Sequence, residues 1–145
     1  MPFKPPRLLI AYDDSRGLCG SVVPRMKQML EERAFSVDTF VLGGDIPDIG
    51  PYAGVIVGAP VLRLGLRPSE LPTPVGVFLD GVEALDEKKV AVFSVYTAWP
   101  GTMVEALKQK VGELGAECVA EYAYWRLKPE WGEHVVPAEC MIRIR

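Results

Sequence analysis

Three short segments of the chain carry residue types that can bind a small ligand. The first, residues 15–21, combines glycines, serines and an arginine ahead of an apolar helical stripe. Backbone N–H groups in such a loop, together with the dipole of the following helix, favour an anion such as phosphate. The same pattern also suits a plain helix start that Ser21 caps. The candidate ligand-binding residues here are Ser15, Arg16, Gly17, Leu18, Cys19, Gly20 and Ser21.

The second segment follows the apolar run at residues 54–57. Gly58 reaches backbone angles closed to other residues, and Pro60 fixes its own φ and disfavours helical angles at Ala59. We therefore predict that the strand ends at Gly58 and that an irregular apolar loop follows. That loop either contacts a flat ligand or folds over its own core. Its candidate ligand-binding residues are Ala59, Pro60, Val61 and Leu62.

The third segment places two aromatic residues directly after another apolar run. Aromatic rings at a strand end suit stacking on a planar ligand ring, although either ring could instead cover the edge of the sheet. Pro100 and the glycine after it are expected to hold Trp99 in a turn. The candidate ligand-binding residues are Tyr96, Thr97, Trp99 and Gly101.

Alternating strand and helix patterns position these segments. Apolar or β-branched runs predict strands at residues 7–12, 36–42, 54–57, 90–95 and 118–124. The apolar spacing of Val22, Met26, Met29 and Leu30 predicts the first helix. A second helix, ragged at its start, is expected over residues 74–84, with Val77, Phe78, Val82 and Leu85 on its apolar side.

The most regular helical pattern follows the third ligand-binding segment. Thr102 and Glu105 have the spacing of a capping box, and Gly115 stands where a C-terminal cap belongs. Repeated strand–helix order predicts a single domain over residues 1–145, a doubly wound α/β sandwich with a parallel sheet between two helical layers. Because ligands of such sheets bind beyond the carboxyl ends of the strands, all three segments are expected at one site.

Composition narrows the function classes. Sixteen Lys and Arg against nineteen Asp and Glu give a net charge of −3 without a basic stripe, so no nucleic acid partner is expected. No apolar run approaches the ~20 residues of a membrane-spanning helix, and the first residues lack an apolar signal segment, which predicts a cytoplasmic protein. Three scattered cysteines and one histidine indicate neither a disulfide framework nor a metal site.

The pattern of several segments resembles the flavodoxin-like family. Residues 52–60 look like its third strand and flavin-contacting loop, and residues 77–80 and 88–93 are similar to its third helix and fourth strand. The resemblance covers residues 7–129 and implies a five-stranded parallel sheet in the order 2-1-3-4-5. The family's last helix is not visible in the sequence, where an alternating, strand-like pattern at residues 140–145 stands instead.

The same resemblance implies the cofactor FMN, with its phosphate on the first segment and its ring between the second and third. It implies electron transfer, to a redox partner protein or to a small acceptor such as a quinone; an enzyme of this kind would be an FMN-dependent oxidoreductase. No catalytic acid–base pair is evident. This chain departs from the family at the phosphate segment, where Asp14, Arg16 and Cys19 replace Ser or Thr, and at Val61 and Leu62, where an aromatic is missing.

Two further patterns give alternatives. The acidic pair Asp13 and Asp14 resembles the magnesium site of response-regulator receiver domains, but Gly58 stands where their phosphorylated aspartate is needed. A flavodoxin-shaped interaction or regulatory domain without cofactor, similar to an inert pseudo-receiver, is therefore the alternative function. The Cys-x5-Arg spacing of Cys19 and Arg25 is interpreted as chance. A homo-oligomer is predicted, because the missing helix would leave apolar surface uncovered.

Overall fold

The computed structural model describes residues 5–61, 70–97 and 101–125. The predictions for Leu62, Trp99 and the strand-like segment 140–145 lie outside these ranges. Within them, five strands alternate with three α-helices. The strands are β1 Arg7–Tyr12, β2 Ser36–Val41, β3 Gly54–Pro60, β4 Lys89–Tyr96 and β5 Glu117–Trp125. The helices are α1 Val23–Glu32, α2 Thr73–Gly81 and α3 Met103–Glu113, with short 3-10 turns η1 Ser15–Gly17, η2 Cys19–Ser21 and η3 Leu85–Glu87.

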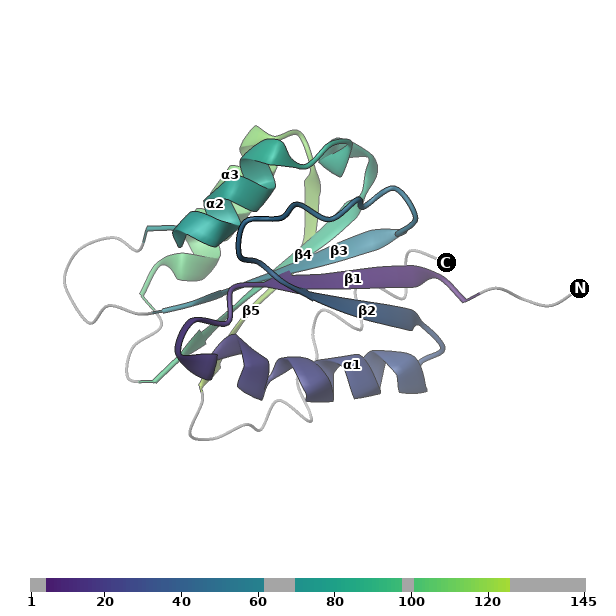
Figure 1. Ribbon diagram of the computed structural model, residues 1–145, viewed down its shortest axis with the longest axis horizontal. Helices are drawn as coiled ribbons and strands as arrows, with labels where there is room; N and C mark the ends of the chain where they lie inside the picture. Colours follow the sequence, from purple (N-terminus) through teal and green to yellow (C-terminus); the bar gives the residue numbers. More distant parts are fainter. Residues whose placement is uncertain (1–4, 62–69, 98–100, 126–145) are drawn as a thin grey trace, which may run out of the picture.

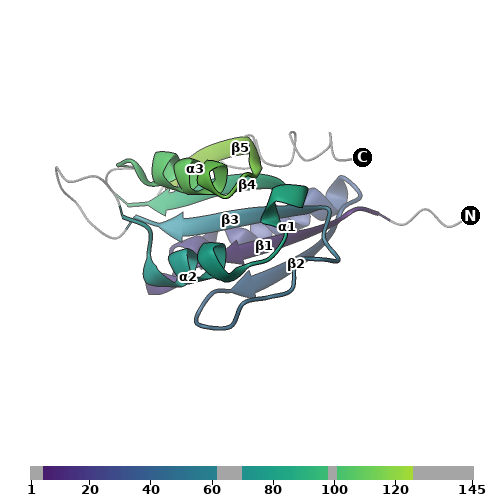
Figure 2. The same cartoon turned by 90° about the horizontal axis from the view of Figure 1, so that it is seen from above.

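The five strands form one parallel sheet in the order β2-β1-β3-β4-β5, so the predicted fold and strand order are confirmed. Figure 1 and Figure 2 show α1 on one face of the sheet and α2 with α3 on the other. Each face carries its own apolar cluster, one around Met26 and Leu30 of α1 and one around Phe78 and Leu107 of the opposite helices.

Side chains of β1 alternate between the two clusters. Leu8 and Ile10 pack on the α1 side, whereas Leu9 and Ala11 pack on the side of α2 and α3. Because helices cover both faces, a central parallel strand is apolar at every position rather than at every second one. This explains why the sequence of β1 reads as a continuous apolar run.

The prediction that the third strand ends at Gly58 is wrong. β3 continues through Pro60, and Ala59 and Pro60 pair in register with Ser94 and Val95 of β4. The N–H of Val61 donates to the carbonyl of Val95 at 3.0 Å, so the nitrogen of Pro60 faces the opposite side, beyond the end of β1. A proline there removes no hydrogen bond from the ladder, which is why the strand tolerates it.

The predicted helices exist, but two of their details differ. α2 ends at Gly81, so Val82 and Leu85 lie beyond it, and Val77 is exposed while Val75, Phe78 and Leu79 are buried. α3 begins at Met103 without a side-chain capping hydrogen bond from Thr102. Its predicted end is confirmed, because Gly115 follows with φ of 82°, in the left-handed region that glycine favours.

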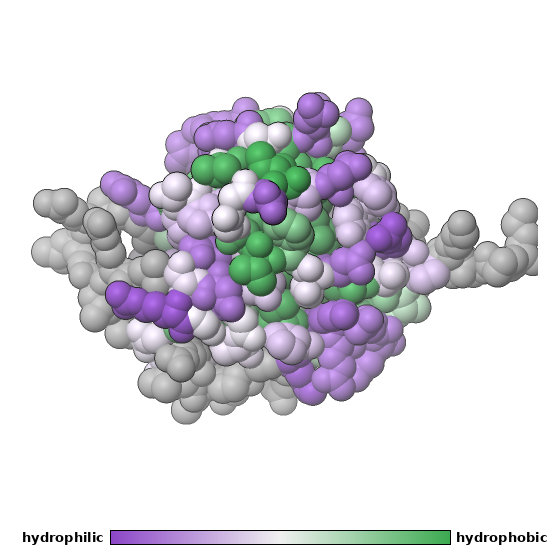
Figure 3. All heavy atoms as spheres, in the orientation of Figure 1, coloured by the Kyte–Doolittle hydropathy of each residue, from purple (hydrophilic) through white to green (hydrophobic). Residues whose placement is uncertain are grey.

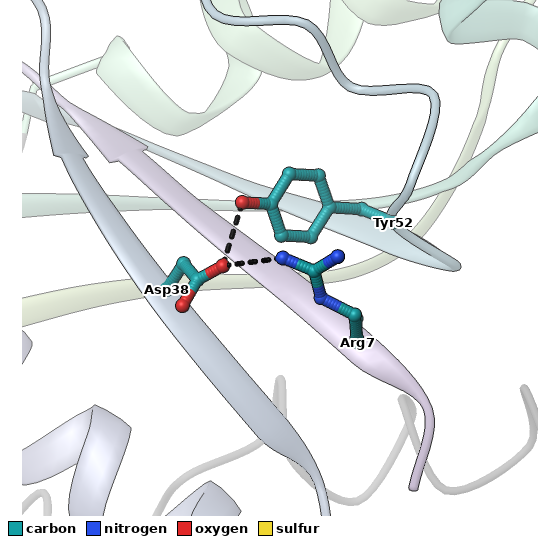
Figure 4. A network of polar contacts seen from close by, with 3 residues as sticks. All are labelled: Arg7, Asp38 and Tyr52. Carbon is teal, nitrogen blue, oxygen red and sulfur yellow. Dashed lines mark hydrogen bonds and ion pairs between the residues drawn. The ribbon is translucent and has the colours of Figure 1, made fainter. Parts of the chain in front are cut away.

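A polar network ties three segments together near the amino ends of β1 and β3 (Figure 4). The hydroxyl of Tyr52 donates to Oδ2 of Asp38 at 2.7 Å, and Nη2 of Arg7 donates to the same oxygen at 2.9 Å. The Arg7 guanidinium also lies 4.9 Å from the centre of the Tyr52 ring. Hydrogen bonds from Tyr52 and then Arg7 lower the pKa of Asp38 below its ordinary value.

Replacing Gly58 by alanine is expected to destabilise the protein. An added Cβ would lie 2.1 Å from Cζ of Phe93, a ring buried in the core, so neighbouring strands would have to shift. We expect Gly58→Ala to lower the free energy of unfolding by about 1–3 kcal/mol in urea denaturation. Gly76→Ala in α2, where an added Cβ meets nothing within 4 Å, should instead be neutral or slightly stabilising. Equal stability of the two variants would contradict this packing argument.

Removing the Tyr52 hydroxyl is expected to raise the pKa of Asp38 toward its ordinary value. A lowered pKa in the folded state stabilises the fold at neutral pH, and this contribution disappears as the pH falls through the lowered pKa. NMR titration of the Asp38 carboxyl carbon in Tyr52→Phe should therefore give a higher pKa than in the wild type. Tyr96→Phe, at the carboxyl end of β4, is the control that should leave the Asp38 titration unchanged. An unchanged Asp38 pKa in Tyr52→Phe would contradict the assigned cause.

Candidate functional site

The carboxyl ends of β1, β3 and β4 meet at one edge of the sheet. The N–H of Asp13 donates to the carbonyl of Gly58 at 3.1 Å, which carries the β1–β3 pairing one residue beyond β1. Strand order reverses at β1, because the chain passes from β1 outward to β2 and then crosses back to β3. The three predicted segments, as far as they are described, therefore leave the sheet at its switch point, where such sheets bind ligands.

The first segment is a compact pair of 3-10 turns rather than an open loop. Arg16 and Gly17 both have left-handed backbone angles, with φ of 59° and 68°. A left-handed arginine is uncommon and marks a constrained turn. Most of the segment's backbone N–H groups donate to acceptors within residues 13–22. These donors belong to Ser15, Gly17, Leu18, Gly20, Ser21 and Val22.

Asp13 is a buried carboxylate at the start of this segment. Its side chain is 3% exposed, and Oδ1 accepts hydrogen bonds from the backbone N–H of Ser15 at 3.0 Å and from the Ser15 hydroxyl at 2.7 Å. Oδ2 is buried and has no hydrogen-bond partner within the described residues. Burying a carboxylate oxygen without a hydrogen bond lowers the stability of the fold unless a donor reaches it.

Asp14 places its carboxylate inside the same segment. Its Oδ1 accepts the backbone N–H of Gly20 at 2.8 Å, six residues further along the chain. A Cβ added at Gly20 would lie 2.5 Å from this oxygen, so only glycine allows the carboxylate to approach the backbone so closely. The chain thus supplies its own anion to the turn that precedes α1.

The first segment, as it stands, does not fit the phosphate of FMN. A phosphate group needs free backbone donors, and the N–H of Gly20 is already bonded to the Asp14 carboxylate. Two unit charges about 4 Å apart near a protein surface interact by roughly 4 kcal/mol, so a phosphate dianion beside Asp14 would be strongly opposed. The carboxylate of Asp13, buried at the same turn, adds to this opposition.

Two of the predicted site residues in the first segment point their side chains into the core. Leu18 and Cys19 belong to the apolar cluster on the α1 side, and Cys19 is fully buried. Burial, and then the charges of Asp13 and Asp14, raise the pKa of the Cys19 thiol. A buried thiol with a raised pKa is not a nucleophile, in agreement with the chance interpretation of the Cys-x5-Arg spacing.

The second and third segments are mainly apolar and lie at the carboxyl ends of β3 and β4. Ala59 and Val61 are buried against the cluster under α2 and α3, and Tyr96 is half-buried against the same cluster. Thr97 is exposed and its carbonyl accepts the indole N–H of Trp125 at 2.8 Å, which fixes the end of β4 to the end of β5. Sequence reasoning missed this contact, because nothing in the local pattern links residues 28 positions apart.

Solved structures of flavodoxins share this arrangement of strands and helices. The two-electron reduced flavodoxin of Megasphaera elsdenii superimposes with a TM-score of 0.76 and 19% identity, over 94% of this chain and 98% of that protein. Oxidised flavodoxin 2 of Bacillus cereus gives a TM-score of 0.73 and 26% identity, again over 94% and 98%. The chain has the flavodoxin-like fold. The resemblance stated from the sequence is thereby confirmed at the level of the fold.

The flavodoxin-like fold also occurs within larger structures. The flavodiiron core of Flv1 from Synechocystis sp. PCC6803 matches with a TM-score of 0.68 and 18% identity, but this chain covers only 34% of it. No family model and no curated protein matches the sequence. Over residues 5–61, 70–97 and 101–125, no helix is long and apolar enough to cross a membrane. The same residues hold no group of three or more His, Cys, Asp or Glu side chains that could bind a metal ion.

Removing the Asp14 carboxylate is expected to expose the Gly20 amide. In Asp14→Ala, amide hydrogen exchange at Gly20 should accelerate about tenfold or more, because a hydrogen bond to a charged group is lost. Asp48→Ala is the matched control: Oδ1 of Asp48 accepts the N–H of Gly50 at 2.9 Å, in the connection that leads into β3. The control should leave Gly20 exchange unchanged. Equal exchange at Gly20 in the wild type and Asp14→Ala would show that this hydrogen bond does not protect it.

Proposed function

We propose that this chain is a flavodoxin-like electron-transfer protein that binds a flavin at the carboxyl ends of β1, β3 and β4. The observation that carries the proposal is the match to flavodoxins over nearly the full length of both chains. The convergence of the three segments at the switch point of the sheet supports it. FMN is the flavin that the family resemblance implies, and a bound flavin supplies one-electron and two-electron redox chemistry.

The described residues have separate roles in this proposal. Tyr96, half-buried at the carboxyl end of β4, would contact the flavin ring and is the one aromatic described among the predicted site residues, whereas Ala59 and Val61 are buried in the core beneath it and would support that surface. The turn at residues 15–21 would lie at the other end of the ligand. Leu62, Trp99 and Gly101 remain predicted ring contacts, of which only Gly101 is described; it has φ of 58° and lies two residues before α3. A redox partner protein, or a small acceptor such as a quinone, would exchange electrons with the ring.

A specific observation favours the alternative of an interaction domain without cofactor. The Asp14 carboxylate occupies the turn that the phosphate would need. In addition, several large apolar side chains remain exposed, among them Val41 at the end of β2, Ile46, and Val77 on α2. Figure 3 shows apolar residues gathered over the middle of one face, as a protein-binding surface or a homo-oligomer would require.

The cytoplasmic location stays a prediction.

Flavin binding by the purified chain tests the proposal. Stripped protein titrated with riboflavin and with FMN should quench the fluorescence of at least one flavin and shift its visible spectrum. Tyr96→Ala should weaken the binding several-fold because part of the ring contact is lost, whereas Tyr52→Phe, near the amino ends of the strands, should not change it. Wild-type protein that binds neither flavin at high micromolar concentration would refute electron transfer by flavin and leave the interaction domain.

A further inference from the structure

The turn before α1 presents carboxylate acceptors, whereas a phosphate site presents hydrogen-bond donors. Asp14 supplies a carboxylate to the Gly20 N–H, and Asp13 supplies a second carboxylate with one buried oxygen that lacks a partner within the described residues. Both groups accept hydrogen bonds, as a phosphate dianion also does. A phosphate beside the Asp14 carboxylate would therefore meet an acceptor where it needs a donor, and the charge of that carboxylate would oppose its own.

A hydroxyl group satisfies this turn better than a phosphate. A hydroxyl can donate to a carboxylate oxygen, and hydrogen bonds of this charge-assisted kind are short and strong. It also carries no charge, so the Asp14 carboxylate can keep its 2.8 Å bond to the Gly20 N–H while a neutral ligand lies beside it.

Resting on the proposed function, we propose that the site selects a flavin without a terminal phosphate, of the riboflavin class, over FMN. Asp14 takes the place of the phosphate as the anion of the turn, so the protein provides from its own chain what a phosphorylated cofactor would bring. Recognition of the ligand then depends on its ring and on the hydroxyls of its side chain. The charge of Asp14 weakens the binding of FMN relative to that of riboflavin.

Paired titrations of the full chain test this selectivity. Wild-type protein titrated with riboflavin and with FMN, followed by flavin fluorescence, should bind riboflavin at least tenfold more tightly. Asp14→Asn removes the charge but keeps an acceptor oxygen near the Gly20 N–H, and it should reduce the ratio of the two dissociation constants about tenfold. Asp48→Asn, the control for a surface aspartate bonded to a glycine N–H, should leave the ratio unchanged. Circular dichroism verifies that each variant is folded.

Salt dependence of the wild-type protein gives a second measurement that needs no variant. Raising the ionic strength screens repulsion between the carboxylates and a phosphate, so FMN binding should strengthen with salt while riboflavin binding stays nearly constant. FMN that binds as tightly as riboflavin, or that weakens with salt, would overturn the selectivity and leave flavin binding standing. A ratio unchanged by Asp14→Asn in the folded variant would also overturn it. Wild-type protein that binds neither flavin would refute the proposed function itself.

Discussion

The pairing of β1 with β3 is the constraint on which the rest of the structure depends. Residues 8–12 of β1 lie in register with residues 54–58 of β3, and both strands are buried on both faces. Because helices must cover two apolar faces at once, the chain places α1 on one side and α2 with α3 on the other. The bond from Asp13 to Gly58 extends this pairing past the end of β1, so the turn before α1 starts at a fixed point beside β3.

Acidic side chains at the two ends of the sheet are satisfied in different ways. Near the amino ends, Asp38 accepts from Arg7 and Tyr52, two side chains that are distant in sequence. At the carboxyl ends, Oδ1 of Asp13 and Oδ1 of Asp14 each accept a backbone N–H of their own turn, while Oδ2 of Asp13 has no partner among the described residues. A carboxylate held by backbone donors consumes the groups that an anionic ligand would use. Because the carboxylates occupy these donors, the chain has the flavodoxin-like fold, but its described turn before α1 lacks the phosphate site expected with that fold.

A side chain of β4 fills the space next to the backbone of β3, so that one position of β3 has room only for glycine. The Phe93 ring lies directly over Gly58, where an added Cβ would come within 2.1 Å of it. Gly58 was recognised from the sequence as a position that needs glycine, but for the wrong reason. It lies inside a strand with an aromatic ring over it, and the strand continues to Pro60 because the proline nitrogen faces away from β4.

The parallel sheet and the edge at which a site is expected could be predicted from the sequence pattern, because buried parallel strands leave long apolar runs and the alternation of strands and helices permits few topologies. The strand order was implied by the resemblance to the flavodoxin-like family. The sequence also identified Asp14 as a departure from the family pattern. The tertiary structure was needed to place that carboxylate, since the contact with Gly20 depends on the two left-handed residues Arg16 and Gly17 that fold the turn back. It likewise decided that Val77 faces solvent and that Trp125 bonds to Thr97, because such contacts depend on how elements pack rather than on the pattern within any one of them.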